Sequence, residues 1–310
     1  MESRESPGGK DKKADPTLGE STRTSQARVR VACIRLRCYN ISRELHVSDH
    51  HLKAMSPAFF KAFPAIAPLL LTAAALHADP ADELIAKGDV YYINLQAAEA
   101  LKYYLPAERL EPNNVRLLVR ISREYRHLMT DATKPEEMLR LGGTAVDYAK
   151  RAVVFDPEDP EAQLAVAISY GKLQPLEGNR EKIEALYIIK NAADKAIKLN
   201  PRSDLGWHVL GRWHKGLADL NAFQRAMAQV AYGKQLPDST YEEAVSCFEK
   251  AIELNPNRLM HYIELGRVYA QMGRTNDARR FIAKGLAMQN TEKDDPETKR
   301  EGRELLARLH

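Results

Sequence analysis

Apolar residues recur at helical spacing along most of the chain, and several of these apolar runs end in a similar way. In four places an alanine is followed five residues later by a proline, as in AERLEP (107–112), AVVFDP (152–157), AIKLNP (196–201) and AIELNP (251–256). A proline and the residue before it both disfavour a continuing helix, so each phrase predicts a helix end. The regular return of this ending indicates a chain built from repeated helical units.

The spacing of these endings divides the chain into five units, each of which predicts a first helix and a second helix. The units are 34, 45, 44, 55 and 34 residues long and cover 81–114, 115–159, 160–203, 204–258 and 259–292. The three longer units predict inserts between their two helices. These inserts contain Pro135, Pro175 and Pro237, which indicates that they are not simply lengthened helices. Residues 296–309 are polar and predict a capping helix at the end of the array.

Each unit resembles the tetratricopeptide (TPR) repeat, whose 34-residue pattern is Trp-x2-Leu-Gly-x2-Tyr, then Ala, then an aromatic residue and Ala-x4-Pro. The last unit matches best, with Leu265, Gly266, Tyr269 and Ala278 in register. Small residues at the eighth and twentieth places of a unit let its two helices approach closely. The resemblance implies an all-α fold, a right-handed TPR-like α-solenoid of five helix pairs plus a C-terminal capping helix.

A closer resemblance covers roughly residues 140–275. The stretches EALYIIKNAADKAIKLNP (184–201), LGWHVLGRWHKGLAD (205–219) and STYEEAVSCFEKAIELNP (239–256) occur in this order, with a long insert in the fourth unit. This order resembles the regulator of microtubule dynamics family. The resemblance implies a TPR-like adaptor, and some members of that family associate with microtubules or sit at membrane contact sites and bind lipid.

The segment before the repeats has the order of a secretory signal peptide. Lys61 precedes an apolar stretch at 62–76, and small residues follow it. We therefore expect translation to begin at Met55 and the protein to be exported, periplasmic or membrane-associated, as in a bacterial member of the family. The alternatives are a signal anchor, a transit segment or a cytoplasmic protein. The expected segments are a disordered or non-native extension (1–54), the signal peptide or anchor (55–78) and the solenoid (79–310).

Charge and composition narrow the classes of function. The chain has 46 basic and 42 acidic residues, but residues 79–310 hold 34 basic and 35 acidic ones. A nearly neutral body argues against nucleic acid as a partner. The solenoid also shows no phosphate-binding glycine loop and no HExxH motif. His208 and His214 are six residues apart, so on one helix they point in different directions. The sequence predicts a protein that is not an enzyme and has no cofactor or metal.

Cationic residues gather at the positions that should face the concave side of the solenoid. In a TPR array the first helix of each unit lines that side, and places 2, 5, 9 and 12 point into it. Seven residues at these places are basic or histidine, and they are the predicted ligand-binding set: Arg116, Arg123, Arg126, His208, Arg212, Lys215 and Arg267. Because guanidinium groups suit carboxylates and phosphates, the expected ligand is an acidic peptide, a protein tail or an anionic lipid head group. The alternative is solvated charges or ion pairs within the repeats.

The insert of the fourth unit predicts an amphipathic helix within residues 217–236. Leu220, Phe223, Met227 and Val230 follow one another at spacings of three and four. We expect this apolar face to close the core against a neighbouring helix. In the alternative, Phe223, Met227 and Val230 face lipid, and the helix covers an apolar pocket of a lipid-binding or lipid-transfer module.

Overall fold

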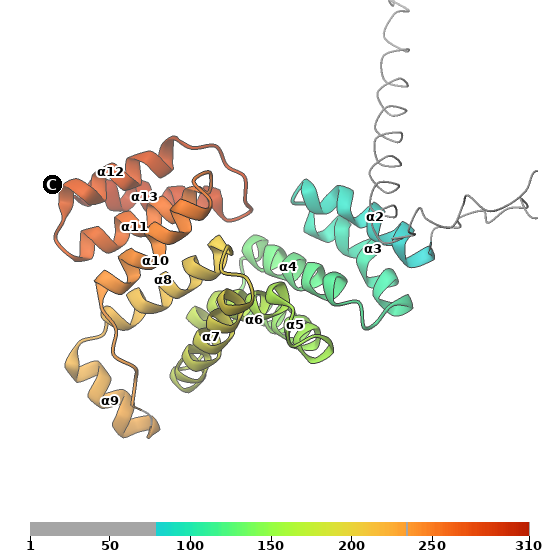
Figure 1. Ribbon diagram of the computed structural model, residues 1–310, viewed down its shortest axis with the longest axis horizontal. Coiled ribbons are helices and arrows are strands. Elements are labelled where there is room, and N and C mark those ends of the chain that lie inside the picture. The colour runs from blue at the N-terminus through green and yellow to red at the C-terminus, as the bar shows by residue number, and fades with distance from the viewer. Residues whose placement is uncertain (1–78, 234, 310) are drawn as a thin grey trace, which may run out of the picture. The chain divides into compact units, whose positions relative to one another are not determined.

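The computed structural model describes residues 79–233 and 235–309, which fall in one compact unit of the chain. The expectations for residues 1–54 and for the signal peptide at 55–78 lie outside these residues and stay predictions. Figure 1 shows that the described residues form a succession of helices, and no strand occurs among them.

Five helix pairs follow one another, as the repeat predicted (Figure 1). In each pair the first and second helices are packed neighbours: α2 (Pro80–Ile93) with α3 (Ala97–Leu110), α4 (Val115–Asp131) with α5 (Pro135–Phe155), α6 (Pro160–Leu173) with α7 (Asn179–Leu199), α8 (Asp204–Ala218) with α10 (Tyr241–Leu254), and α11 (Leu259–Gln271) with α12 (Thr275–Ala287). A final helix, α13 (Asp295–Arg308), packs on α11 and α12 as the predicted cap. The expected all-α, right-handed TPR-like solenoid is confirmed.

The repeated alanine–proline phrase has a direct structural role at the helix ends. Helices α3, α5, α7 and α10 each end at an apolar residue, and the next residue donates its backbone N–H to the carbonyl of the alanine that opens the phrase: Ala107, Ala152, Ala196 and Ala251. A polar residue then starts the following helix. Asn114, Asp159 and Ser203 each accept a backbone N–H in the first turn of α4, α6 or α8.

The close approach of paired helices depends on small residues at the eighth place of a unit. In the fifth unit, a Cβ added to Gly266 would lie 2.6 Å from Cγ1 of Ile282 and 3.0 Å from the carbonyl oxygen of Ala278. In the second unit this place is Ser122, whose hydroxyl donates to the carbonyl of Ala145 at 2.8 Å. The TPR register predicted from sequence therefore identifies the tightest contact between the helices.

The expectation that the inserts are not lengthened helices is wrong for the second and third units. Helices α5 and α7 each have 21 residues, against 14 in α3. Pro135 occupies the first turn of α5, where a proline costs nothing because its missing N–H would have no helical partner. Pro175 lies in a short 3-10 helix, η3 (Gln174–Leu176), just before α7. Among the described residues, only the fourth unit has an inserted α-helix between its two paired helices.

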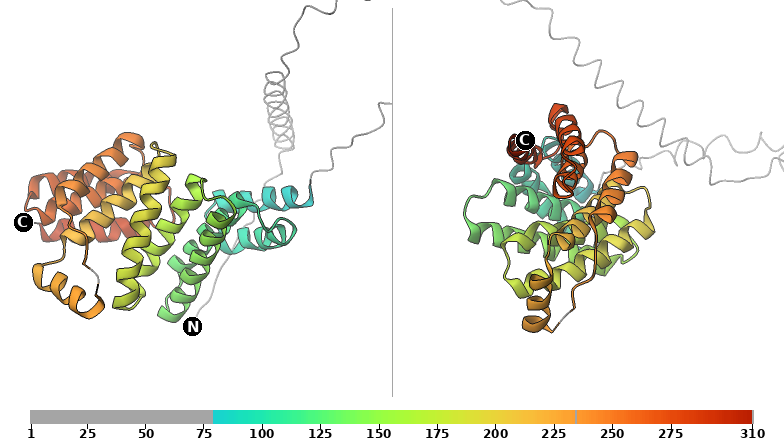
Figure 2. Two further views of the ribbon diagram at one scale, coloured as in Figure 1. Left: turned by 60° about the horizontal axis from the view of Figure 1, so that its bottom comes forward. Right: turned by 90° about the vertical axis from the view of Figure 1, so that its left-hand side faces the viewer.

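That inserted element is α9 (Ala222–Tyr232), which stands away from the helix pairs in Figures 1 and 2. The expectation that its apolar face closes the core is wrong, because Phe223, Met227 and Val230 are 73%, 50% and 83% exposed. The opposite face does the packing, with Ala228 and Tyr232 against the core cluster. Whether the exposed face meets lipid stays a prediction. None of the described helices is both long enough and apolar enough to cross a membrane.

Candidate ligand-binding groove

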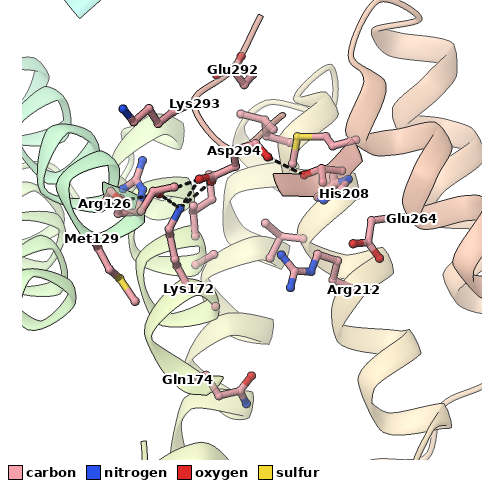
Figure 3. Close-up of a pocket in the computed structure, with 18 of the residues that line it drawn as sticks. Arg126, Met129, Lys172, Gln174, His208, Arg212, Glu264, Glu292, Lys293 and Asp294 are labelled. Carbon is pink, nitrogen blue, oxygen red and sulfur yellow. Dashed lines mark hydrogen bonds and ion pairs between the residues drawn. The ribbon is translucent and has the colours of Figure 1, made fainter. Parts of the chain in front are cut away.

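The first helices of the second to fifth units enclose a cavity of about 880 Å³ together with the segment that precedes α13. This volume falls within the range of about 300–1,000 Å³ that small-molecule sites occupy. Part of the wall is apolar: Val119, Leu164, Ile168, Val209, Trp213 and Met260. Charged side chains make up much of the rest, and Figure 3 shows Arg126 and Arg212 on either side of Lys172.

Six of the seven predicted ligand-binding residues line this cavity: Arg123, Arg126, His208, Arg212, Lys215 and Arg267. Arg116 is exposed but lies outside the cavity wall. The TPR register therefore brings six of them together, while their binding of a ligand stays a prediction. Three of the six form ion pairs within the chain, in line with the alternative of internal ion pairs. Arg123 pairs with Glu292 at 3.4 Å, Lys215 pairs with Asp219 at 2.6 Å, and Arg267 pairs with Glu301 at 2.7 Å.

The four residues directly before α13, Thr291–Asp294, cross the mouth of the groove, and we call them the strap. Asp294 meets the ammonium of Lys172 at 2.6 Å and accepts the Thr130 hydroxyl at 2.7 Å (Figure 3). Glu292 pairs with Arg258 at 2.7 Å and with Arg123 at 3.4 Å. The chain thus places its own acidic residues where the sequence predicted an acidic ligand.

The sequence analysis did not predict the strap or three residues that contact it: Thr130, Lys172 and Arg258. The positions of Thr130 and Lys172 in the repeat could have indicated that they face the groove. Thr130 lies one helical turn after Arg126, which is the twelfth place of the second unit. This extra turn exists because α4 continues to Asp131. Lys172 directly follows the twelfth place of the third unit. Arg258 precedes α11 and had no place in the repeat pattern. The pairing of the strap with α4 and α6 joins residues more than a hundred positions apart, which no local pattern can indicate.

Arg126 is a buried cation without a carboxylate partner among the described residues. Its side chain donates to the hydroxyls of Ser169 and Ser122 at 2.9 and 3.1 Å, and the residue is only 8% exposed. Burial, followed by the nearby charge of Arg123, lowers the pKa of Arg126 to about 10, so it remains charged at neutral pH. A buried charge that is met only by hydroxyl dipoles favours an anion beside it.

Arg212, on α8, is a second cation without a carboxylate partner among the described residues. Its side chain is exposed, and it forms no hydrogen bond or ion pair with any residue in the described ranges. Burial lowers the pKa of Lys172 below its usual value, and the ion pair with Asp294 offsets part of this decrease. The groove therefore has cationic side chains on two walls. Of these cations, Lys172 is the one that forms an ion pair with Asp294 of the strap.

A buried chain of hydrogen bonds ends at the cavity wall. Asp204 contacts Nε2 of His261 at 3.0 Å, and Nδ1 of His261 contacts Nδ1 of His208 at 2.9 Å. With both rings neutral, Asp204 accepts from His261, which in turn accepts from His208. Nε2 of His208 is then left as an acceptor. Burial lowers the pKa of His208 well below its usual value and also lowers that of His261. His208 therefore contributes an acceptor to the groove and no positive charge at neutral pH.

This histidine pair predicts acid destabilisation of the folded protein. The unfolded chain binds protons at histidine near pH 6.5, whereas the folded protein keeps both rings neutral to lower pH. The unfolded state therefore binds more protons below about pH 6.5, and the free energy of unfolding decreases as the pH falls from about 7 toward 5. Urea unfolding at several pH values should show this decrease, and His208→Gln should make it shallower. An equally steep decrease in the variant would contradict the assignment.

Neither a cluster of metal-binding side chains nor a reactive thiol is found among the described residues. No group of three or more His, Cys, Asp or Glu side chains among them is arranged to hold a metal ion. Cys247 is buried, and burial raises the pKa of its thiol to about 11, so the reactive thiolate is scarce at neutral pH.

Fold and groove together define a TPR-type solenoid of the kind that serves as a protein-interaction scaffold. The crystal structure of TTC0263, a thermophilic TPR protein of Thermus thermophilus, is similar in fold. Its TM-score is 0.52 at 17% identity, over 72% of this chain and 98% of that chain. At this identity the similarity concerns the fold alone.

Sequence comparisons identify the family to which the chain belongs. The family model described as "Regulator of microtubule dynamics protein 1-3" matches residues 81–310. Regulator of microtubule dynamics protein 1 of Mus musculus is 31% identical over 245 residues, which are 78% of this chain and 79% of the mouse protein. The Bos taurus protein is 30% identical over 256 residues, 82% of this chain and 80% of its own length. The chain belongs to the regulator of microtubule dynamics family, as the resemblance in residues 140–275 indicated.

Proposed function

We propose that this protein is a non-enzymatic interaction scaffold whose concave groove binds an acidic segment of a partner protein. The observation that carries the proposal is the seating of Asp294 in the groove. Its carboxylate receives the Lys172 ammonium at 2.6 Å and the Thr130 hydroxyl at 2.7 Å, as the carboxylate of a ligand side chain would. Charge-assisted hydrogen bonds of this kind are shorter and stronger than hydrogen bonds between neutral groups.

The remaining surface of the groove indicates what else the partner carries. Ile168 and Val209 are partly exposed and line the cavity beside Arg212, which pairs with no other residue in the described ranges. Burial of apolar surface contributes about 25 cal/mol per Å², so a segment with both acidic and apolar side chains gains more than a purely acidic one. The names of the relatives make microtubules a partner to test. For this chain, microtubule binding rests on family membership alone.

A short synthetic peptide that alternates Glu with Leu, called here the Glu–Leu peptide, tests this proposal on the full chain. We expect saturable binding that weakens as salt is raised, because ions screen charges beyond about 8 Å at physiological ionic strength. The matched peptide with Gln in place of Glu keeps the apolar residues and removes the charges, so it should bind at least about tenfold more weakly, which is about 1.4 kcal/mol. Equal affinity for the two peptides, independent of salt, would contradict an acidic ligand.

A lipid-binding or lipid-transfer function is the second candidate, and one observation favours it. The cavity of about 880 Å³ combines apolar walls with the buried charge of Arg126, which suits an acyl chain ending in an anionic head group. Mass spectrometry of the purified protein separates the two candidates. Copurified anionic lipid that is displaced from the protein by neither peptide would favour the lipid function. A lipid-free protein that binds the Glu–Leu peptide would favour the scaffold.

A further inference from the structure

We propose that the strap is a built-in competitor for the groove. In this inference the groove has an anion-binding subsite formed by Thr130, Lys172 and Arg126. The carboxylate of Asp294 fills this subsite until an acidic ligand displaces the strap. The inference rests on the proposed function, because it concerns the regulation of the same site. It adds that the free protein holds its groove partly closed.

The strap and a ligand would use the same protein atoms. The two carboxylate oxygens of Asp294 lie 2.6 and 2.7 Å from Nζ of Lys172, and one of them also accepts the hydroxyl of Thr130. Behind this pair stands Arg126, which has no carboxylate within ion-pair distance among the described residues. A ligand carboxylate can reach this subsite only after Asp294 has moved away. Glu292 blocks a second position in the same way, since Arg123 and Arg258 both face it.

The contacts that hold the strap are of the kind that an external ligand can replace. Its four side chains, Thr, Glu, Lys and Asp, include none that is apolar. The Asp294 side chain is 50% exposed and that of its partner Lys172 is 22% exposed; the values for Asp131 and its partner Lys293 are 53% and 24%. Because water reaches one partner of each pair, each pair contributes modestly and weakens with salt. A ligand with leucine or a similar side chain would also cover Ile168 and Val209, which are partly exposed and which the strap has no apolar group to cover.

The ends of the strap are anchored, so its release need not unfold the cap. Helix α13 is held on α11 by the pair of Arg267 with Glu301 at 2.7 Å and by Gly302, which faces Ile263. Asp295, the first residue of α13, is buried and accepts the backbone N–H groups of Thr291 and Glu292 at 2.7 and 2.8 Å. This turn presents the two acidic residues to the groove. Because the strap is tethered, its effective concentration at the groove is on the order of millimolar, enough to compete with a ligand of modest affinity.

The double variant Glu292→Gln with Asp294→Asn tests the competition on the full chain. It keeps the size of both side chains and leaves Asp295 and α13 intact, but removes the charges that seat the strap. We expect the variant to bind the Glu–Leu peptide about tenfold more tightly than the wild type does, because it loses the ion pairs of Asp294 with Lys172 and of Glu292 with Arg123 and Arg258, which frees the subsite. The control Glu253→Gln with Glu304→Gln removes two exposed acidic charges elsewhere and should bind like the wild type.

Carbodiimide coupling, which joins a carboxylate directly to an amine that it touches, gives a second readout. The free protein should form an internal cross-link between Lys172 and Asp294, and its yield should fall as the Glu–Leu peptide is added. Equal affinities of wild type and strap variant, with an undiminished internal cross-link, would overturn the competitor while leaving the peptide site intact. Failure of both proteins to bind the peptide would overturn the proposed function itself, and the inference with it.

Discussion

The Gly266→Leu variant is expected to lose about 3 kcal/mol of folding stability, at the upper end of what overpacking a core usually costs. The added side chain would start 2.6 Å from Ile282 Cγ1 and 3.0 Å from the backbone oxygen of Ala278. The Ile282 side chain could rotate away from the added leucine. The backbone of α12 at Ala278 could move only if α11 and α12 separated. The fifth unit carries the cap α13, so the loss should extend to the end of the solenoid.

Urea unfolding of Gly266→Leu and of a matched control measures this effect. Gly143 also lies inside a helix, α5, but a Cβ built there meets no atom within 4 Å. Gly143→Leu should therefore be neutral or should stabilise the protein by up to about 0.8 kcal/mol, because leucine favours the helix more than glycine does. Equal stability of the two variants would show that the eighth place of the TPR register is not the close contact described above.

The second large effect is on binding. Arg123→Glu together with Arg212→Glu should weaken the Glu–Leu peptide about a hundredfold, or about 2.7 kcal/mol, since each change removes an attraction and adds a repulsion. Both residues occupy the ninth place of a first helix, and both line the cavity. Arg212 has no partner to lose among the described residues, and Arg123 gives up a 3.4 Å pair with Glu292 and a contact over the ring of Tyr92. Helicity should therefore remain intact.

Arg116→Glu with Arg202→Glu is the matched control for this charge reversal. Both arginines are exposed and lie outside the cavity wall. The control changes the net charge of the protein by the same amount, so it separates the local effect of the groove from long-range attraction. Fluorescence anisotropy with a labelled Glu–Leu peptide compares the two doubles. A similar loss of affinity in both would place the peptide outside the groove.

The sequence predicted most where a local pattern repeats. The alanine–proline phrase indicated the ends of α3, α5, α7 and α10, because the backbone contact it makes spans only four residues. The same register predicted the cavity-lining positions of Arg126 and Arg212, since helical periodicity alone decides which side chains share a face.

The rest depends on contacts that periodicity does not encode. The meeting of Asp294 with Lys172 joins residues 122 positions apart, and it requires the cap to turn the strap back over the groove. The prolines of the second and third inserts gave a wrong prediction about helix length, because Pro135 is compatible with the first turn of the long helix α5. On α9, spacing predicted an apolar face, but it could not indicate that Phe223 would point to solvent.

Mapping where a bound acidic peptide touches the protein tests the central claim most directly. Carbodiimide coupling of the Glu–Leu peptide to the full chain, followed by mass spectrometry, identifies the lysines that its carboxylates contact. A peptide bound in the groove should couple to Lys172, which lines the cavity, in place of the internal partner Asp294. Coupling confined to lysines outside the groove, such as Lys195 or Lys250, with the Lys172–Asp294 cross-link unchanged, would contradict the account.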